Sequence, residues 1–337
     1  MPTPTFIIAE LAQAHDGSLG ILHSYIDALA AAGVDAVKFQ THIAEAESSA
    51  HEPFRVNFSY EDATRYDYWQ RMGFTAEQWR GIKVHCDEAG VEFLSSPFSQ
   101  AAVDLLETLD VKRYKIGSGE VTNFLMLEKI CRTGKPVILS SGMSNFAELD
   151  EAVAFVEQYG NDLSILQCTT SYPTPPERLG LNVIGELKER YPKHTIGLSE
   201  HTAELYASIA GVALGAEVLE FHAVFDRRMF GPDAKSSLTI DEITTLVDQV
   251  RKLETTLQHP IDKSDNSQYR TLKGIFEKSL AVNKDLPAGH VITFEDLEAK
   301  KPAGHGIQAS KFGEVLGKSL TRAKRRYAFL NQADLEY

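Results

Sequence analysis

The sequence is poor in cysteine and has no excess of positive charge. Its three cysteines, Cys86, Cys131 and Cys168, are widely spaced and form no Cys-x-x-Cys pair. No disulfide framework or thiolate metal motif is therefore expected, and a reducing cytoplasm is the natural compartment. The formal net charge of −13 disfavours nucleic-acid partners, which need a basic footprint. An anionic ligand would have to be held by a local cluster of cations.

Long apolar runs are also missing. No uncharged stretch reaches the roughly 20 apolar residues of a membrane helix. The segment from Met1 to Phe6 lacks the basic region and apolar stretch of a signal peptide. We therefore predict a cytoplasmic protein without a membrane partner. Its 337 residues are enough for a barrel of about 250 residues and a small extra domain.

The chain does contain eight short apolar runs that each end in polar residues. They occupy residues 6–10, 36–40, 92–96, 114–118, 137–141, 165–169, 196–201 and 218–222. Helix-like periodicity follows many of them, at residues 21–32, 75–89, 145–156, 204–214 and 240–257. This alternation predicts parallel strands joined by crossover helices. Eight such units indicate an α/β fold of the closed (β/α)8 TIM-barrel type, with an active site at the C-terminal ends of the strands.

Two segments fall outside this pattern. Residues 44–73 are too long for an ordinary connection and are rich in aromatic residues, so we predict a folded excursion beside the barrel mouth. Composition changes again after Leu257. We assign residues 1–258 to the barrel, 259–277 to a polar linker and 278–337 to a small, mostly β domain. A domain of this size is expected to pack on a larger partner surface.

Two histidines end neighbouring strands of the predicted barrel. His201 and His222 are 21 residues apart, which matches no short metal motif, and two ordinary histidines would show the same spacing. Adjacent parallel strands lie about 4.8 Å apart, however, so both imidazoles can reach one ion. Two imidazoles with open positions suit a catalytic divalent cation such as Mn²⁺.

Two lysines lie inside apolar runs, where a charge is costly unless it is paired or used. Lys38 and Lys115 can enter the barrel mouth together with Ser118, Ser140 and Ser199, which forms a set of cations and hydroxyls suited to phosphate and carboxylate. The alternative is that each lysine only pairs with a neighbouring glutamate. A Schiff-base role is less favoured because no pattern shows a desolvated lysine.

Other strand-end residues are candidates for acid–base work or for holding sugar hydroxyls. Glu10, Glu120 or Glu220 can act as a general base or remain in a structural salt bridge. Gln40, Tyr172 and Asp233 are candidates for polyol hydroxyls, although Asp233 also belongs to a plain Gly-Pro-Asp turn. Cys168 also ends a strand, but a buried thiol is more often a core residue than a nucleophile.

The ordered set of motifs resembles the sialic acid synthases. It comprises Ala9-Glu10, His15-Asp16-Gly17, residues 37–42 (VKFQTH), Ser96-Pro97-Phe98, residues 114–120 (YKIGSGE), residues 140–144 (SSGMS), Cys168-Thr169, residues 172–175 (YPTP), residues 197–202 (GLSEHT), residues 220–222 (EFH) and residues 231–233 (GPD). The C-terminal part resembles the antifreeze-like (SAF) domain appended to these enzymes. The resemblance covers nearly the whole chain.

The resemblance implies condensation of phosphoenolpyruvate with an N-acylated hexosamine such as N-acetylmannosamine. The products would be a nine-carbon 3-deoxy-2-ulosonic acid and phosphate, formed with C–O cleavage. It also implies a domain-swapped homodimer in which the SAF domain of one subunit caps the barrel of the other. By position, the metal ligands would be His201 and His222, holding Mn²⁺ or alternatively Mg²⁺ or Co²⁺. The catalytic set would be Glu10, Lys38, Lys115 and Glu120; the phosphoenolpyruvate set Lys38, Ser96, Lys115, Ser118, Ser140, Thr170 and Ser199; and the sugar set Gln40, Tyr172, Asp233 and Lys301.

Three positions depart from the family pattern. Ala14 stands where the family often has Asn, and Thr170 stands where many members have Asn near phosphoenolpyruvate. Lys301 replaces the usual Arg that reaches the N-acyl group of the sugar, and lysine cannot make a planar bidentate contact. Two alternatives therefore stay open. One is a legionaminic, pseudaminic or other 3-deoxy-ulosonate synthase with a different aldose, and the other is a non-catalytic sugar-binding protein.

Overall fold

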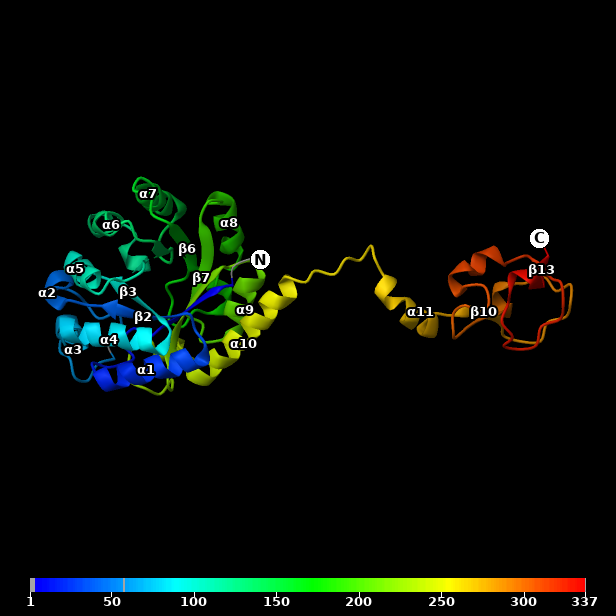
Figure 1. Cartoon of the computed structure of the whole chain (residues 1–337), viewed down its shortest axis with the longest axis horizontal. Coiled ribbons are helices and arrows are strands. Elements are labelled where there is room, and N and C mark those ends of the chain that lie inside the picture. The colour runs from blue at the N-terminus through cyan, green and yellow to red at the C-terminus, as the bar shows by residue number, and fades with distance from the viewer. Residues whose placement is uncertain (1–3, 57, 337) are drawn as a thin grey trace. The chain divides into compact units, whose positions relative to one another are not determined.

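The eight apolar runs form the parallel strands of one barrel (Figure 1). The computed structural model describes residues 4–56 and 58–336, so the first three residues of the segment judged for a signal peptide lie outside it. The strand order is β3-β2-β1-β8-β7-β6-β5-β4, and β3 packs beside β4 to close the barrel, which confirms the predicted fold. The strands are β1 (Phe6–Glu10), β2 (Ala36–Thr41), β3 (Glu92–Pro97), β4 (Tyr114–Ile116), β5 (Val137–Ser140), β6 (Leu163–Cys168), β7 (Thr195–Glu200) and β8 (Val218–Val224).

Helices surround the strands, as Figure 1 shows. Local signals fix their ends: Thr75 and Gln78 form a capping box at the start of α4, Asn145 caps α7, and Gly33 ends α1 with a left-handed φ of 85°. A short strand, β9 (Leu238–Thr239), pairs with β8 before α10 begins. The helices of the barrel are α1 (Leu19–Ala32), α4 (Ala76–Ala89), α5 (Gln100–Thr108), α6 (Phe124–Cys131), α7 (Phe146–Glu157), α8 (Asn182–Arg190), α9 (Leu205–Ala213) and α10 (Ile240–Leu257).

The inside of the barrel holds an apolar layer beneath a polar one. Six buried side chains form the apolar layer: Ile8, Ala36, Leu94, Ile138, Leu166 and Val218. Side chains two positions apart on a strand point to the same face. The next inward residues are therefore Glu10, Lys38, Ser96, Ser140, Cys168 and Glu220, one layer nearer the C-terminal ends. The same rule relates Ser199 to Gly197, where a Cβ would collide with the carbonyl oxygen of Val218.

The long segment 44–73 is folded, as its aromatic content predicted. It contains α2 (Ala44–Glu47) and α3 (Arg65–Met72), and Tyr68 and Trp69 are buried in a small apolar cluster with Phe54 and Phe58 packed against it. Aromatic burial on this scale stabilises a segment that has little other regular structure.

The remaining chain forms a second compact unit, residues 260–337, with its own apolar core. The stretch predicted as a polar linker differs from expectation, because residues 270–276 form a helix. The strands of this unit form two small sheets, as expected of the predicted β domain, but short 3₁₀ segments are as extensive as the strands. The helix is α11 (Arg270–Phe276), and the strands are β10 (Ser279–Val282), β11 (Leu297–Lys300), β12 (Ser319–Leu320) and β13 (Leu335–Glu336).

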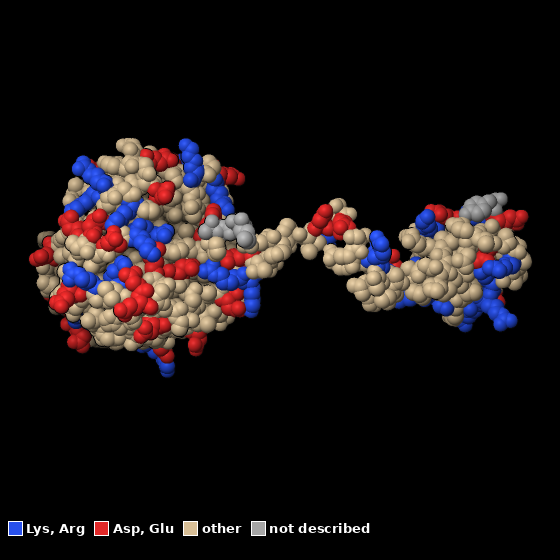
Figure 2. Space-filling model, viewed as in Figure 1, with Lys and Arg blue, Asp and Glu red and all other residues tan. Residues whose placement is uncertain are grey.

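The surface of the barrel unit carries charges of both signs. Figure 2 shows Lys and Arg interspersed with Asp and Glu over the face that it displays. Within residues 4–56 and 58–336, no helix is long and apolar enough to cross a bilayer.

A buried carboxylate organises one turn of the second unit and gives a first prediction. Asp296 accepts hydrogen bonds from the backbone N–H and the hydroxyl of Thr293 (2.8 and 2.9 Å) and pairs with Lys284 and His290 (2.7 and 2.8 Å). Burial alone would raise the pKa of Asp296, but these partners hold it far below its ordinary value. Its stabilising contribution should thus be complete above about pH 4 and be lost as the pH falls further. Asp296→Ala should destabilise the second unit by about 2 kcal/mol.

The measurement is amide hydrogen exchange of β10 in the full-length chain at neutral pH. Exchange at Leu280 and Val282 should accelerate about 30-fold in the variant, since about 2 kcal/mol corresponds to that factor. Asp285→Ala, on the surface of the same unit, is the control. Equal exchange rates in both variants would contradict the role of Asp296.

Candidate active site

A cavity of about 370 Å³ opens at the C-terminal ends of the strands. All fourteen predicted site residues that belong to the barrel line it. They are Glu10, Lys38, Gln40, Ser96, Lys115, Ser118, Glu120, Ser140, Thr170, Tyr172, Ser199, His201, His222 and Asp233. The fifteenth, Lys301, belongs to the second unit, where its Nζ lies 4.8 Å from the ring centre of Phe276. Thus the topology brings together residues spread over more than 220 positions.

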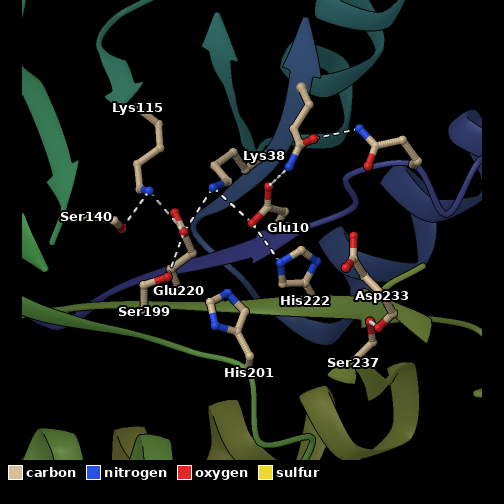
Figure 3. Close-up of polar contacts among 12 residues, drawn as sticks. Glu10, Lys38, Lys115, Ser140, Ser199, His201, Glu220, His222, Asp233 and Ser237 are labelled. Atoms are coloured by element: carbon tan, nitrogen blue, oxygen red, sulfur yellow. Dashed lines mark hydrogen bonds and ion pairs between the residues drawn. The ribbon is translucent and has the colours of Figure 1, made fainter. Parts of the chain in front are cut away.

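Two buried lysines and two buried glutamates form the floor of the cavity (Figure 3). Lys38 Nζ lies 3.0 Å from Glu10 Oε2 and 2.9 Å from Glu220 Oε1. Lys115 Nζ lies 3.2 Å from the same Glu220 oxygen and donates to Ser140 Oγ at 2.8 Å. Ser199 Oγ donates to Glu220 Oε1 at 2.9 Å. One glutamate oxygen therefore holds both ammonium groups and a hydroxyl.

Burial and pairing act in opposite directions on these four groups. Burial alone would raise the pKa of Glu10 and Glu220, but the neighbouring lysines lower both overall, so the carboxylates stay ionised at neutral pH. Burial would lower the pKa of Lys38, yet Glu10 and Glu220 raise it overall. For Lys115 burial prevails, with Lys38 adding to it, and its pKa is lowered. The floor is thus a buried, paired charge cluster, and an anion that binds there meets cations already in place.

The other oxygen of Glu10 is held by a chain of amides. Gln40 Nε2 donates to Glu10 Oε1 at 2.7 Å, and Gln13 Nε2 donates to Gln40 Oε1 at 2.6 Å. Gln13 Nε2 also lies 3.0 Å from His42 Nε2, while His42 Nδ1 lies 2.6 Å from Glu47 Oε1. A His42 tautomer that donates from Nδ1 to Glu47 accepts the Gln13 N–H at Nε2, and in that tautomer it makes no hydrogen bond to Gln40 Oε1, which lies 3.1 Å away. This network fixes which oxygen of Glu10 faces Lys38.

The His42 ring is itself clamped by stacking. It lies nearly parallel between Trp69 and Phe98, with ring centres 3.7 and 4.4 Å away. Replacing His42 with Phe keeps the stacking but removes both ring nitrogens. We expect stability to fall by about 1–2 kcal/mol, since Glu47 and Gln13 lose a buried partner. Turnover should fall about tenfold as Gln40 and Glu10 lose their fixed orientation.

Urea unfolding and steady-state turnover of the predicted condensation test this variant. His194→Phe is the matched control, because His194 lies outside the cavity lining and pairs with Glu157 on the barrel exterior. Wild-type kcat in His42→Phe would contradict the positioning role.

The two predicted metal ligands face each other across the cavity. The ring centres of His201 and His222 are 5.2 Å apart, and that of Tyr172 is 4.2 Å from His201. His201 Nδ1 lies 3.1 Å from the carbonyl oxygen of Thr169, an arrangement that leaves Nε2 as a ligand. His222 Nε2 lies 3.1 Å from Glu10 Oε2.

This donor set fits a weakly held catalytic ion. Among the described residues, no group of three or more His, Cys, Asp or Glu is arranged to hold a metal. Two imidazoles therefore suit an ion that takes its other ligands from water and substrate. A structural metal site would instead need a closed set of protein ligands.

A second wall of the cavity is built around Gly142. Its N–H donates to Ser118 Oγ at 3.0 Å. A Cβ at this position would come 2.5 Å from both Ser118 Oγ and Thr170 Oγ1, so a side chain would displace both hydroxyls. The thiol of Cys168 lies beside them; burial alone would raise its pKa, but His201, Ser118 and Lys115 lower it overall. The hydroxyls of Ser118 and Thr170 thus converge on one side of the cavity, where they suit an oxyanion ligand.

Four further residues that line the cavity were not assigned to the site from the sequence. Glu220 was weighed only as one of three strand-end glutamates, although its position two residues before His222 places it on the inner face. Gln13, His42 and Arg55 also line the cavity. No short-range pattern marks them, because each acts through partners that are distant in the sequence.

The chain matches two family models. The model described as NeuB family matches residues 25–262, and that of the SAF domain matches residues 277–336. The N,N'-diacetyllegionaminic acid synthase of Campylobacter jejuni is 35% identical over 324 residues, which cover 94% of this chain and 96% of the relative. The human N-acetylneuraminate-9-phosphate synthase is 31% identical over 94% of this chain and 89% of its own. The pseudaminic acid synthase of Campylobacter jejuni is 32% identical over 98% and 96%.

Solved structures show the same architecture. The N-acetylneuraminic acid (sialic acid) synthetase of Leptospira borgpetersenii, solved with citrate, superposes with a TM-score of 0.71 at 27% identity, covering 80% of this chain and 91% of its own. The spore coat polysaccharide biosynthesis protein spsE of Bacillus subtilis has a TM-score of 0.67 at 26% identity over 100% and 96%. The predicted resemblance to sialic acid synthases with a SAF domain is confirmed.

Proposed function

The chain belongs to the NeuB family, and from that premise we propose that it condenses phosphoenolpyruvate with the open-chain aldehyde of an N-acylated hexosamine. The products are a nine-carbon 3-deoxy-2-ulosonic acid and phosphate. The observation that carries the proposal is the buried floor of Lys38 and Lys115, set below the facing imidazoles of His201 and His222. The floor suits an anion and the imidazoles suit a cation beside it.

Phosphoenolpyruvate supplies the anionic groups for the floor. Lys38 and Lys115 offer two ammonium groups, and Ser140 and Ser199 offer hydroxyls within the same cluster. Ser96, Ser118 and Thr170 line the cavity around them. Because Glu10 and Glu220 hold both lysines before the substrate arrives, little reorganisation accompanies binding. The enol carbon is thereby kept at a fixed place in the cavity.

One water molecule completes the reaction. The C2=C3 π bond of phosphoenolpyruvate opens as C3 bonds to the aldehyde carbon, and the aldehyde oxygen becomes an alkoxide. Water adds to C2 and one of its protons goes to that alkoxide. The C2 hydroxyl then loses its proton as the C2=O bond forms, the C–O bond to the phosphate breaks, and phosphate leaves with that proton. A divalent ion held by His201 and His222, for which we favour Mn²⁺ over Mg²⁺ or Co²⁺, would supply Lewis-acid polarisation of the aldehyde oxygen.

Two carboxyl groups of the cavity, those of Glu10 and Glu120, suit different roles in the reaction. The lysines keep Glu10 ionised, so it suits orientation of the attacking water or a substrate hydroxyl. Burial raises the pKa of Glu120, which lines another side of the cavity and accepts from Asn123 Nδ2 at 2.7 Å. A carboxyl with a raised pKa holds its proton more readily than an ordinary glutamate, which suits it to donate a proton.

Sugar binding falls to residues above the floor. Gln40, Tyr172 and Asp233 line the cavity and offer amide, phenol and carboxylate groups for hydroxyls. We propose a homodimer in which Lys301 of the partner subunit adds a contact from its SAF domain. Its single ammonium group would contact the N-acyl group less selectively than a planar guanidinium.

A second candidate is a synthase for a diamino-dideoxy sugar, toward legionaminic or pseudaminic acid. It is favoured by the names of the two Campylobacter jejuni relatives. A non-catalytic sugar-binding protein is the third candidate, and the paired lysines and facing histidines count against it.

The deciding experiment measures phosphate release from phosphoenolpyruvate with Mn²⁺ and a panel of aldoses. N-acetylmannosamine, its 6-phosphate and a 2,4-diacetamido-2,4,6-trideoxyhexose separate the first two candidates by kcat/KM. We expect release only when an aldose is present. No release with any of the three sugars would eliminate the synthase proposal.

A further inference from the structure

Arg55 reaches from the excursion 44–73 to two of the predicted sugar-binding residues. Its Nη2 lies 2.6 Å from Asp233 Oδ1, and its guanidinium carbon lies 4.1 Å from the ring centre of Tyr172. Tyr172 in turn packs against His201, with ring centres 4.2 Å apart. Arg55 also lines the cavity. Three segments that are distant in the sequence therefore meet at this guanidinium.

Most of the hydrogen-bonding capacity of Arg55 is unused. Within residues 4–56 and 58–336, its only hydrogen-bond acceptor is Asp233. A guanidinium has five N–H donors in a planar fork, so donors remain for a ligand. Its side chain is 38% exposed and reachable from the cavity opening. The pairing with Asp233 and the stacking on Tyr172 hold the fork in one orientation, which reduces the entropy lost on binding.

The charge around Arg55 favours a neutral acceptor over an anion. Asp233 already neutralises Arg55, and Glu52 Oε1 lies 3.0 Å from Arg65 Nε at the same cavity. Six carboxylates and four lysine or arginine side chains line the cavity as a whole. An additional phosphate on the sugar would meet no surplus positive charge here. An amide carbonyl can accept from the fork without adding charge.

Apolar rings line the same cavity as this fork. Phe54 and Phe58 line the cavity and are only partly buried, with ring centres 6.0 Å apart. Burying the methyl group of an N-acetyl substituent against apolar lining of this kind is favourable, because it removes apolar surface from water. A guanidinium beside aromatic rings is thus suited to an N-acyl substituent.

We propose that Arg55 binds the N-acyl carbonyl of a non-phosphorylated amino sugar and is a specificity-determining residue of this chain. The inference rests on the proposed function for the identity of the site. Arg55 belongs to the same barrel unit as the lysines and glutamates of the floor. It lies in a segment in which no sequence motif indicated a site residue.

The test compares kcat/KM of the wild type and of the Arg55→Ala variant for two sugars, N-acetylmannosamine and mannose. Arg55→Ala should lower kcat/KM for N-acetylmannosamine about 10- to 100-fold, as expected for loss of a charge-assisted hydrogen bond. For mannose, which carries a hydroxyl in place of the acylamino group, the loss should be less than about threefold. The KM for phosphoenolpyruvate should not change. Arg55→Lys should recover only part of the loss, because it restores charge without the planar fork.

Arg228→Ala is the matched control, since Arg228 is exposed, pairs with Asp226 two residues away and is not among the residues that line the cavity. Equal losses for both sugars would overturn the inference and leave Arg55 a structural partner of Asp233. A wild-type preference for N-acetylmannosamine 6-phosphate over the free sugar would overturn it as well. Isothermal titration of the two non-phosphorylated sugars repeats the comparison without turnover. If phosphate release fails with every sugar, Arg55-dependent binding in that titration still upholds the subsite, and its absence overturns it.

Discussion

Replacing Lys38 with Met should both destabilise the barrel and abolish phosphate release. The substitution leaves Glu10 without its lysine and Glu220 with only Lys115, although both carboxylates remain buried. Removing one partner of a buried ion pair costs about 3–5 kcal/mol. Turnover should fall more than about 10³-fold, because the anion loses a preorganised cation. Urea unfolding followed by tryptophan fluorescence reports on the barrel, since Trp69 and Trp79 are the two tryptophans of the chain.

A double variant separates the two effects. Lys38→Met with Glu220→Gln removes one positive and one negative charge, so the floor keeps Lys115 and Glu10 in balance. We expect most of the stability to return while activity stays lost. Lys129→Met is the surface control; its pair with Asp104 is partly exposed and should contribute less than about 1 kcal/mol. A single variant as stable as wild type would contradict the view of the floor as a coupled charge cluster.

Replacing His222 with Ala should remove both metal binding and turnover. His222 lies 5.2 Å from His201 between ring centres and touches Glu10, so one imidazole alone would remain for the ion. We expect phosphate release to fall more than about 10³-fold and Mn²⁺ affinity to fall at least about tenfold. Electron paramagnetic resonance of free Mn²⁺ measures the affinity independently of turnover.

His259→Ala serves as the matched control, because His259 is exposed at the end of the barrel unit and its ring lies against the carbonyl of Thr255, four residues earlier near the end of α10. Retained activity with unchanged Mn²⁺ affinity in His222→Ala would remove the metal assignment. If phosphate release is lost while the affinity for Mn²⁺ is unchanged, His222 would act by orienting Glu10 and not by binding the ion.

Much of the fold could be predicted from the sequence because it follows from local periodicity. Each inward residue of the polar layer lies two positions after an apolar one, as Glu10 follows Ile8 and Lys38 follows Ala36. A lysine inside an apolar run is costly anywhere except at a site that pairs it. The sequence therefore predicted the barrel, five of its helices and the polar layer at the carboxyl ends.

The pairing of side chains within that polar layer could not be predicted from the sequence. No sequence pattern near Glu220 indicates that one of its oxygens contacts Lys38, Lys115 and Ser199 together. His42 and Arg55 entered the site through contacts with Gln13 and Asp233, which lie 29 and 178 positions away.

Sequence alone thus determined which residue types line the carboxyl ends of the strands, because strand alternation is a local property of the backbone. The tertiary structure decided which carboxylate oxygen pairs with which lysine, and where the Arg55 guanidinium lies at the cavity opening. The physical reason is that closure of the barrel and packing of the aromatic excursion set the distances between side chains, and pairing energies in a buried site depend on those distances.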